Sequence, residues 1–311
     1  MNSSSVNGKP ATCSAKRPAW ASRSHQPLLF LSNDVTEIPL AECEALAALY
    51  QTAGGPGWYA NTNWLIRLQP CSWYGVGCAS GHVTALHLYE NNLSGSIPTA
   101  IKDLEELQIL QLWGNQLGGS IPTEIGTLSE LTELCLQDNE LSGAIPTAIG
   151  SLPQLTLLYL NSNELSGAIP TRIGMLSALT ELDLSSNQLS GEIPWQIGNL
   201  TTTLTSLSLH NNSLTGTIPV EIGDLTALTE LDLSHNQLSG AIPGQIGNLA
   251  ALTTLSLHHN VLTGTIPAEI GDLGALTFLS LHNNELSGEI PVEIGDLTAL
   301  EVLFGSMSNP V

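Results

Sequence analysis

The sequence has very few basic residues. Among its 311 residues, 7 are Lys or Arg and 28 are Asp or Glu, which gives a formal net charge of -21. Four of the seven basic residues lie in the first 23 positions, and beyond Lys102 the only one is Arg172. Binding to phosphates needs Lys and Arg to replace counterions, so DNA, RNA and anionic lipid surfaces repel a body of this composition. The composition therefore argues against nucleic acid and membrane surfaces as partners.

Long apolar runs and enzyme motifs are also missing. The most apolar short stretch, Leu28 to Leu31, has four residues, whereas a membrane span needs roughly 20 and a signal-peptide core about 7 to 15. The chain contains no Gly-x-Ser-x-Gly, no phosphate-binding Gly-rich loop with Lys and no His-Glu-x-x-His. The sequence thus predicts no membrane span, no cofactor and no catalytic activity.

Cysteine is scarce, and its spacing favours a disulfide over a metal site. The five cysteines are Cys13, Cys43, Cys71, Cys78 and Cys135. Cys71 and Cys78 are close enough to close one tight loop, and two cysteines alone cannot provide the four ligands of a zinc site. A disulfide is the simplest interpretation and favours an oxidising compartment. The states of Cys13 and Cys43 stay open.

From Val83 onward one unit of 24 residues recurs, with a single 25-residue step at Thr201–Thr203. Each unit contains Leu-x-Leu, as at Leu231 and Leu233, which predicts a short strand with both leucines inward. An Asn follows at the corner, where its amide can bond backbone groups of its own and the neighbouring coil. The nine asparagines are Asn91, Asn115, Asn139, Asn163, Asn187, Asn212, Asn236, Asn260 and Asn284.

The full pattern, Leu-x-x-Leu-x-Leu-x-x-Asn-x-Leu-Ser-Gly-x-Ile-Pro-x-x-Ile-Gly-x-Leu, resembles the plant-type leucine-rich repeat. Upstream, Trp58, Trp64 and the segment from Cys71 to Cys78 resemble that family's N-terminal cap, in which these two cysteines bond each other. The resemblance implies an α/β repeat fold: a curved solenoid with parallel strands on its concave face and an N-terminal helical cap. The family comprises receptor-like kinase ectodomains, receptor-like proteins and secreted inhibitors of cell-wall-degrading enzymes.

This resemblance implies a non-catalytic scaffold that binds a protein, peptide or carbohydrate on its concave face, outside the cell or at its surface, with a membrane co-receptor as a further candidate partner. We divide the chain into a disordered basic Ser-rich tail (1–40), the cap (41–82), an array of nine full units and a partial tenth (83–303), and a frayed end (304–311). The tail also has a composition found in transit peptides, so an organelle or the cytoplasm stays open.

Two columns of side chains are expected to face outward along the concave face, one residue per unit. Their N-terminal half presents three aromatic residues, Tyr89, Trp113 and Tyr159, beside Gln111 and Gln137. Exposed aromatic side chains with a polar group commonly anchor interfaces or stack on sugars, so we hypothesise a recognition patch here. The alternative is that these positions vary freely because nothing packs on them.

Cys135 falls in the same columns, and we expect an incidental exposed thiol.

The C-terminal half carries five of the eight histidines: His210, His235, His258, His259 and His282. Imidazoles on adjacent coils can chelate a divalent ion or act as a pH sensor. The alternative is drift at exposed corners, where His, Asn and Ser interchange. No supporting pattern for a metal is visible in the sequence, so it assigns no metal site.

A second function also fits the repeat. A column of threonines recurs beside the first strand leucine, and flat repetitive rows of hydroxyls can order water. The alternative function is therefore an ice- or surface-interacting structural protein. The column consists of Thr132, Thr156, Thr180, Thr205, Thr229, Thr253 and Thr277.

Overall fold

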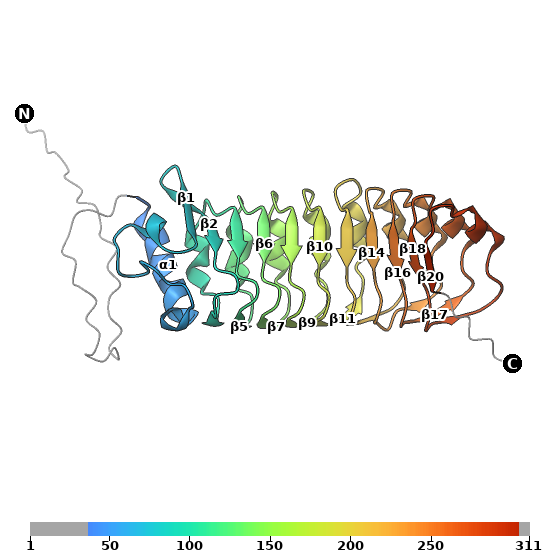
Figure 1. Ribbon diagram of the computed structural model, residues 1–311, viewed down its shortest axis with the longest axis horizontal. Helices are drawn as coiled ribbons and strands as arrows, with labels where there is room; N and C mark the ends of the chain where they lie inside the picture. Colours follow the sequence, from blue (N-terminus) through green and yellow to red (C-terminus); the bar gives the residue numbers. More distant parts are fainter. Residues whose placement is uncertain (1–36, 305–311) are drawn as a thin grey trace, which may run out of the picture.

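The computed structural model describes residues 37–304 of the chain. They form an elongated stack of coils with a helix at the N-terminal end (Figure 1). Nearly all of the expected tail and of the expected frayed end lies outside the described residues, as does Cys13. The fold class is the expected one: a long parallel sheet of short strands, 3₁₀ turns on the other side and one N-terminal helix.

The N-terminal end of the stack is covered by a helix, two 3₁₀ turns and a hairpin. These are α1 (Leu40–Thr52), η1 (Gly55–Gly57), η2 (Pro70–Ser72), β1 (Val76–Ala79) and β2 (His82–His87). The strand β1 pairs with β2 antiparallel, and β2 is the first strand of the stack. Cys71 and Cys78 are bonded to each other, with 5.6 Å between their Cα atoms, which confirms the expected disulfide.

Three tryptophans form the core of this covering. Trp64 is 1 % exposed, and its ring centroid lies 5.0 Å from those of both Trp58 and Trp73. Each indole N–H donates to a backbone carbonyl, so burial leaves none of the three without a partner. The buried carboxylate of Glu42 then ties α1 to β2 by accepting the Val83 N–H at 2.7 Å and pairing with His82 Nδ1 at 2.6 Å.

Within the described residues, eleven strands make the main sheet, all parallel after the first pair. After β1 and β2 they are β4 (Ile109–Gln111), β6 (Glu133–Cys135), β8 (Leu157–Tyr159), β10 (Glu181–Asp183), β12 (Ser206–Ser208), β14 (Glu230–Asp232), β16 (Thr254–Ser256), β18 (Phe278–Ser280) and β20 (Val302–Phe304). The paired leucines of each unit point inward as expected; Leu231 and Leu233 are fully buried. We call the outer side of this sheet the concave face.

A second set of strands runs along the flank of the stack, split into a six-stranded and a three-stranded sheet in the part described. They are β3 (Ser94–Gly95), β5 (Gln116–Gly119), β7 (Glu140–Gly143), β9 (Glu164–Gly167), β11 (Gln188–Glu192), β13 (Ser213–Thr215), then β15 (Ser239–Gly240), β17 (Val261–Gly264) and β19 (Glu285–Leu286).

Short 3₁₀ helices complete each coil on the side away from the main sheet. They are η3 (Thr99–Asp103), η4 (Thr123–Thr127), η5 (Thr147–Ser151), η6 (Thr171–Met175), η7 (Trp195–Asn199), η8 (Val220–Asp224), η9 (Gly244–Asn248), η10 (Ala268–Asp272) and η11 (Val292–Asp296). Adjacent coils approach closely here: a Cβ added to Gly150 would lie 2.3 Å from the carbonyl oxygen of Arg172. Glycine follows Ile in the repeat because no side chain fits between the coils.

The corner asparagines form a ladder through the stack. The Nδ2 of Asn163 donates to the carbonyls of Leu136 and Leu160 at 3.0 and 3.1 Å, and its Oδ1 accepts the N–H of Leu141 at 3.0 Å. One amide thus satisfies backbone groups of two coils, as the sequence predicts. The same hydrogen bonds recur from Asn115 to Asn284, so the amide of each corner Asn links its coil to the preceding coil.

Candidate recognition face

Parallel pairing places one residue of every unit opposite its equivalent in the next unit, which confirms the expected columns. The first column runs His87, Gln111, Cys135, Tyr159, Asp183, Ser208, Asp232, Ser256 and Ser280. Two residues further along each unit, a second column contains Tyr89, Trp113, Gln137 and Asn161, and later His210, His258 and His282. Not every member is exposed: Ser185, Ser234, Ser256 and Ser280 are buried.

Tyr89 and Trp113 form a stacked aromatic pair near the N-terminal end of the concave face. Their ring centroids are 4.7 Å apart and their planes differ by 2°. Tyr89 is 41 % exposed and Trp113 is partly exposed, so the pair offers a flat apolar surface to solvent. Such a surface can receive an aromatic side chain, an aliphatic side chain or the face of a sugar ring.

Gln111 lies in a chain of side-chain hydrogen bonds beside this pair. Its Oε1 is 2.9 Å from His87 Nδ1, and its Nε2 donates to Glu133 Oε2 at 3.0 Å. Both ends of the amide are therefore engaged within the face. Gln111 fixes its neighbours in place more than it offers free hydrogen-bonding groups.

The other two predicted residues, Gln137 and Tyr159, lie at the edge of a hollow. The Tyr159 hydroxyl donates to Glu181, and burial, followed by that bond and the charge of Glu181, raises the pKa of Tyr159 far above its ordinary value. The hydroxyl is therefore protonated at neutral pH. The Oε1 of Gln137 is buried and accepts no hydrogen bond from the described residues.

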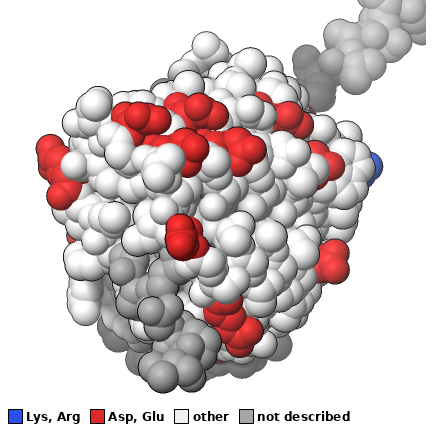
Figure 2. Space-filling model, turned by 90° about the vertical axis from the view of Figure 1, so that its right-hand side faces the viewer, with Lys and Arg blue, Asp and Glu red and all other residues white. Residues whose placement is uncertain are grey.

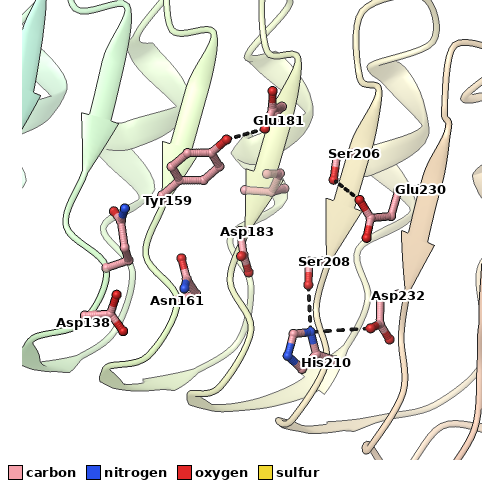
Figure 3. A pocket seen from close by; sticks show the side chains of 12 residues that line it. Asp138, Tyr159, Asn161, Glu181, Asp183, Ser206, Ser208, His210, Glu230 and Asp232 are labelled. Carbon is pink, nitrogen blue, oxygen red and sulfur yellow. Dashed lines mark hydrogen bonds and ion pairs between the residues drawn. The ribbon is translucent and has the colours of Figure 1, made fainter. Parts of the chain in front are cut away.

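The hollow has a volume of about 450 Å³ and extends across the coils of β6 to β14. Figure 3 shows its polar lining, with the Tyr159–Glu181 bond on one side and His210 beside Asp232 on the other. Five of its lining residues are carboxylates, and none is Lys or Arg. The lining is Gln137, Asp138, Tyr159, Asn161, Glu181, Leu182, Asp183, Ser206, Ser208, His210, Glu230 and Asp232.

Glu181 and Glu230 are lining residues that were not predicted from the sequence. They belong to a third outward column, one residue before the inward leucine of each strand, which also holds Glu133. The same alternation that predicts the first column, extended back by two residues, would have placed them on the concave face. Polar side chains from three columns therefore make this part of the face acidic.

The histidines of the C-terminal half are brought into contact with one another. His235 stacks on His259 with ring centroids 4.2 Å apart, and His258 stacks on His282 at 4.7 Å. His210 stands apart from these rings, with its Nδ1 2.8 Å from Ser208 Oγ and 3.7 Å from Asp232. Across residues 37–304, no group of three or more His, Cys, Asp or Glu side chains is arranged to hold a metal ion.

The expectation of an exposed thiol at Cys135 was wrong: the residue is buried, with 5 % of its surface exposed. Gln111 and Tyr159 flank it in register on the neighbouring strands, and their larger side chains cover the small thiol. Burial, and then the charge of Glu133, raise the pKa of Cys135 to about 12. A thiol that stays protonated at neutral pH is a poor nucleophile, so this residue gives no support to an enzymatic site.

The threonine column has a structural use. Each hydroxyl donates to the backbone carbonyl of the equivalent position one coil back, as Thr156 does to Thr132 at 2.9 Å. The same bond recurs from Thr132 to Thr277. These hydroxyl protons are therefore committed to holding the coils together.

Models of the leucine-rich repeat match most of the stack. They cover residues 129–189 as "Leucine rich repeat", 202–244 as "Leucine Rich repeats (2 copies)", and 82–104, 106–128, 251–273 and 275–297 as "Leucine Rich Repeat". The chain belongs to the leucine-rich-repeat family.

Solved structures of two plant receptor ectodomains resemble this leucine-rich-repeat chain. The ectodomain of the Arabidopsis thaliana membrane receptor kinase GASSHO1/SCHENGEN3, in complex with CASPARIAN STRIP INTEGRITY FACTOR 2, is 41% identical over 74% of this chain, with a TM-score of 0.73. The Arabidopsis receptor kinase HAESA, in complex with the peptide hormone IDA and the co-receptor SERK1, is 34% identical over 82%, with a TM-score of 0.71. This chain spans only 28% and 44% of those two chains.

A third similar structure matches this chain over nearly its whole length. It is a plant ice-binding protein that is 28% identical to this chain, with a TM-score of 0.67, and the match covers 87% of this chain and 97% of the ice-binding protein.

No helix within residues 37–304 combines the length and apolar character needed to cross a membrane.

Proposed function

We propose that this chain is a non-catalytic recognition scaffold whose concave face binds a protein, peptide or carbohydrate partner, outside the cell or at its surface. The observation that carries the proposal is the exposed Tyr89–Trp113 pair, which lies on the same face as an acidic hollow of about 450 Å³. One of the receptors similar to this chain, HAESA, is in complex with a peptide hormone, and the Cys71–Cys78 disulfide suits an oxidising compartment.

Charge narrows the ligand class. The hollow is lined by five carboxylates, Asp138, Glu181, Asp183, Glu230 and Asp232, and contains no Lys or Arg. Carboxylates on a shared surface favour a ligand with Lys, Arg or amino groups and disfavour a polyanion. We therefore favour an extended peptide or protein segment with an apolar or aromatic group for the Tyr89–Trp113 pair and basic groups for the hollow.

The test is an affinity pull-down with the full chain as bait, compared with Trp113→Ala and Trp195→Ala. Trp195 is 55 % exposed and lies in η7, away from the main sheet, so it is a matched tryptophan control. We expect Trp113→Ala to lose the partner and Trp195→Ala to retain it. Equal capture by wild type and Trp113→Ala would remove the aromatic pair from the proposed interface.

A second candidate function is ice binding, and the extent of one match favours it. This chain spans nearly the whole plant ice-binding protein but less than half of the receptor ectodomains. The threonine column is a weak basis for it, because its hydroxyls donate to the backbone. A more suitable surface for ice is formed by the second set of strands, on the flank of the stack. We call the Ser or Thr at equivalent positions of these strands the flank row; it includes Ser166 on β9, Ser190 on β11 and Thr215 on β13.

Ice-recrystallisation inhibition decides between the two functions. Ice binding predicts that the wild type keeps crystals smaller than albumin does at equal concentration, and that Ser190→Tyr, which places a bulky ring in the flank row, loses the effect. Crystal sizes that match those in albumin would end this candidate function.

A further inference from the structure

Four imidazole rings from three successive coils form one cluster near the C-terminal end of the concave face. We call His235, His258, His259 and His282 the histidine cluster. Besides the two stacked pairs, His235 meets His258 edge-on at 5.1 Å between centroids, and His259 meets His282 edge-on at 5.3 Å. Sequence spacing alone places these residues near one another, but it does not predict that the rings touch.

The inner nitrogens of one stacked pair are turned into the protein. His282 Nδ1 lies 3.0 Å from Ser280 Oγ, and His258 Nδ1 is buried without a hydrogen-bond partner. No hydrogen bond within the described residues involves the Nε2 of either ring. A metal-binding histidine commonly has its second ring nitrogen hydrogen-bonded to the protein, which fixes the tautomer and the ring orientation. His282 and Ser280 have that arrangement.

Two further residues lie beside the cluster. Asn283 Nδ2 is 2.9 Å from His259 Nε2, so that ring nitrogen already has a hydrogen-bond partner. The ring of Phe304 lies 6.0 Å from that of His282. Neither contact engages the Nε2 of His258 or of His282, so these two atoms are the ones that can bind an ion.

We propose that the histidine cluster is a surface site for one divalent transition-metal ion of the zinc, nickel or copper class, with His258 and His282 as its protein ligands through Nε2. Two nitrogens at about 2.0–2.1 Å from one ion lie roughly 3–3.4 Å apart. The stacked ring centroids are 4.7 Å apart and the ring planes differ by 13°, so both side chains must rotate to direct their Nε2 lone pairs at one ion. Water completes the coordination.

This site is independent of the proposed recognition function. It uses the C-terminal part of the face, whereas the Tyr89–Trp113 pair lies toward the N-terminal end, and none of the cluster residues lines the acidic hollow. Imidazole suits zinc, nickel and copper, while calcium and magnesium prefer oxygen ligands, so selectivity for the former group is part of the proposal.

The test is isothermal titration of the untagged full chain with ZnCl₂ and NiCl₂ at pH 7.5, with CaCl₂ as the contrasting ion. We expect one zinc or nickel ion per chain and no heat with calcium. The double variant His258→Ala/His282→Ala should lower the affinity by at least about tenfold, a loss that even supporting residues of metal sites produce. At pH 5.5 the wild type should bind more weakly, because protons compete for the imidazoles.

Two matched variants make the assignment sharp. His210→Ala removes a histidine of the same column that contacts no ring of the cluster, and it should leave the affinity within about twofold of wild type, well below the tenfold loss of a site residue. His235→Ala/His259→Ala removes the other stacked pair and should weaken binding less than the first double variant. Absence of heat with the wild type, or unchanged binding by folded His258→Ala/His282→Ala with a native circular dichroism spectrum, overturns the proposal.

Discussion

The two ends of the stack bury the same kind of residue to very different degrees. At the N-terminal end, Trp64 is 1 % exposed among other aromatic rings. At the other end, Ile290 and Leu303 are 52 % and 45 % exposed, although their equivalents one coil earlier, Ile266 and Leu279, are buried. Figure 2 shows that end, with acidic side chains spread over it. The comparison shows that the burial of an apolar repeat residue depends on the next coil packing against it, as expected for a linear array in which each repeat contacts only its neighbours.

The largest expected effect follows from the covered end. Trp64→Ala removes a fully packed indole and should destabilise the chain by about 3–5 kcal/mol. Leu303→Ala, on a half-exposed side chain, should cost no more than about 1 kcal/mol. Urea unfolding followed by far-ultraviolet circular dichroism compares them, and similar losses for both would contradict the difference between the ends.

The next effect concerns the asparagine ladder in the middle of the stack. Asn163→Ala leaves backbone groups of Leu136, Leu160 and Leu141 without their partner and should cost about 2–3 kcal/mol. Asn199→Ala is the control, because Asn199 is exposed on η7 and makes no side-chain hydrogen bond within the described residues. A loss below about 0.5 kcal/mol for Asn163→Ala in the same unfolding assay would show that water replaces the ladder.

A smaller effect separates recognition from folding. Trp113→Ala removes a stacked but partly exposed ring and should cost about 1 kcal/mol of stability, the scale of an aromatic pair. If thermal unfolding shows a loss as large as that of Trp64→Ala, the Tyr89–Trp113 pair belongs to the structural core and any binding defect of this variant has a simpler explanation.

The smallest effects depend on pH and have opposite signs at the two ends. The hydrogen bond to Glu42 raises the pKa of His82 above its ordinary value of 6.5, so the stability that this contact adds is full below pH 6.5 and is lost as the pH rises through the raised pKa. Burial lowers the pKa of His258, so its contribution is present above pH 6.5 and is lost as the pH falls through 6.5 toward the lowered pKa.

Melting temperatures of wild type, His82→Ala and His258→Ala at pH 5.5 and pH 8 check these signs. The deficit of His82→Ala relative to wild type should be larger at pH 5.5 than at pH 8. For His258→Ala, the melting temperature relative to wild type should be higher at pH 5.5 than at pH 8. Deficits that do not change with pH would mean that neither imidazole is coupled to folding.

Much of the fold follows from the sequence, because a fixed period carries three separate signals. The Leu-x-Leu alternation, the corner asparagines and the Ile-Gly step each have one physical reason; the first two recur in all nine units, and Ile-Gly recurs in every unit but the first, which has Ile101-Lys102. The spacing of Cys71 and Cys78 made a disulfide the simplest interpretation, and the resemblance of the surrounding segment implied the same bond. Column membership also follows, since parallel pairing in register turns a spacing of 24 residues into neighbours on one face.

What could not be predicted depends on the sizes and contacts of neighbouring side chains. Cys135 lies in an outward column yet is buried, because Gln111 and Tyr159 beside it are larger. The hollow is lined by side chains from three outward columns, of which two were predicted from the sequence. Glu181 belongs to the third column, one residue before the inward leucine of each strand. Likewise, stacking of His258 on His282 requires ring orientations that no spacing specifies.

The central claim is that this leucine-rich-repeat chain recognises a partner on its concave face. The most direct measurement is the dissociation constant for the captured partner, determined by calorimetry for wild type, Trp113→Ala and Trp195→Ala. We predict at least a tenfold weakening for Trp113→Ala, since buried interface tryptophans commonly contribute about 2 kcal/mol or more, and no change for Trp195→Ala. Weakening by Trp195→Ala with no change for Trp113→Ala would place the interface on the opposite side and contradict the account.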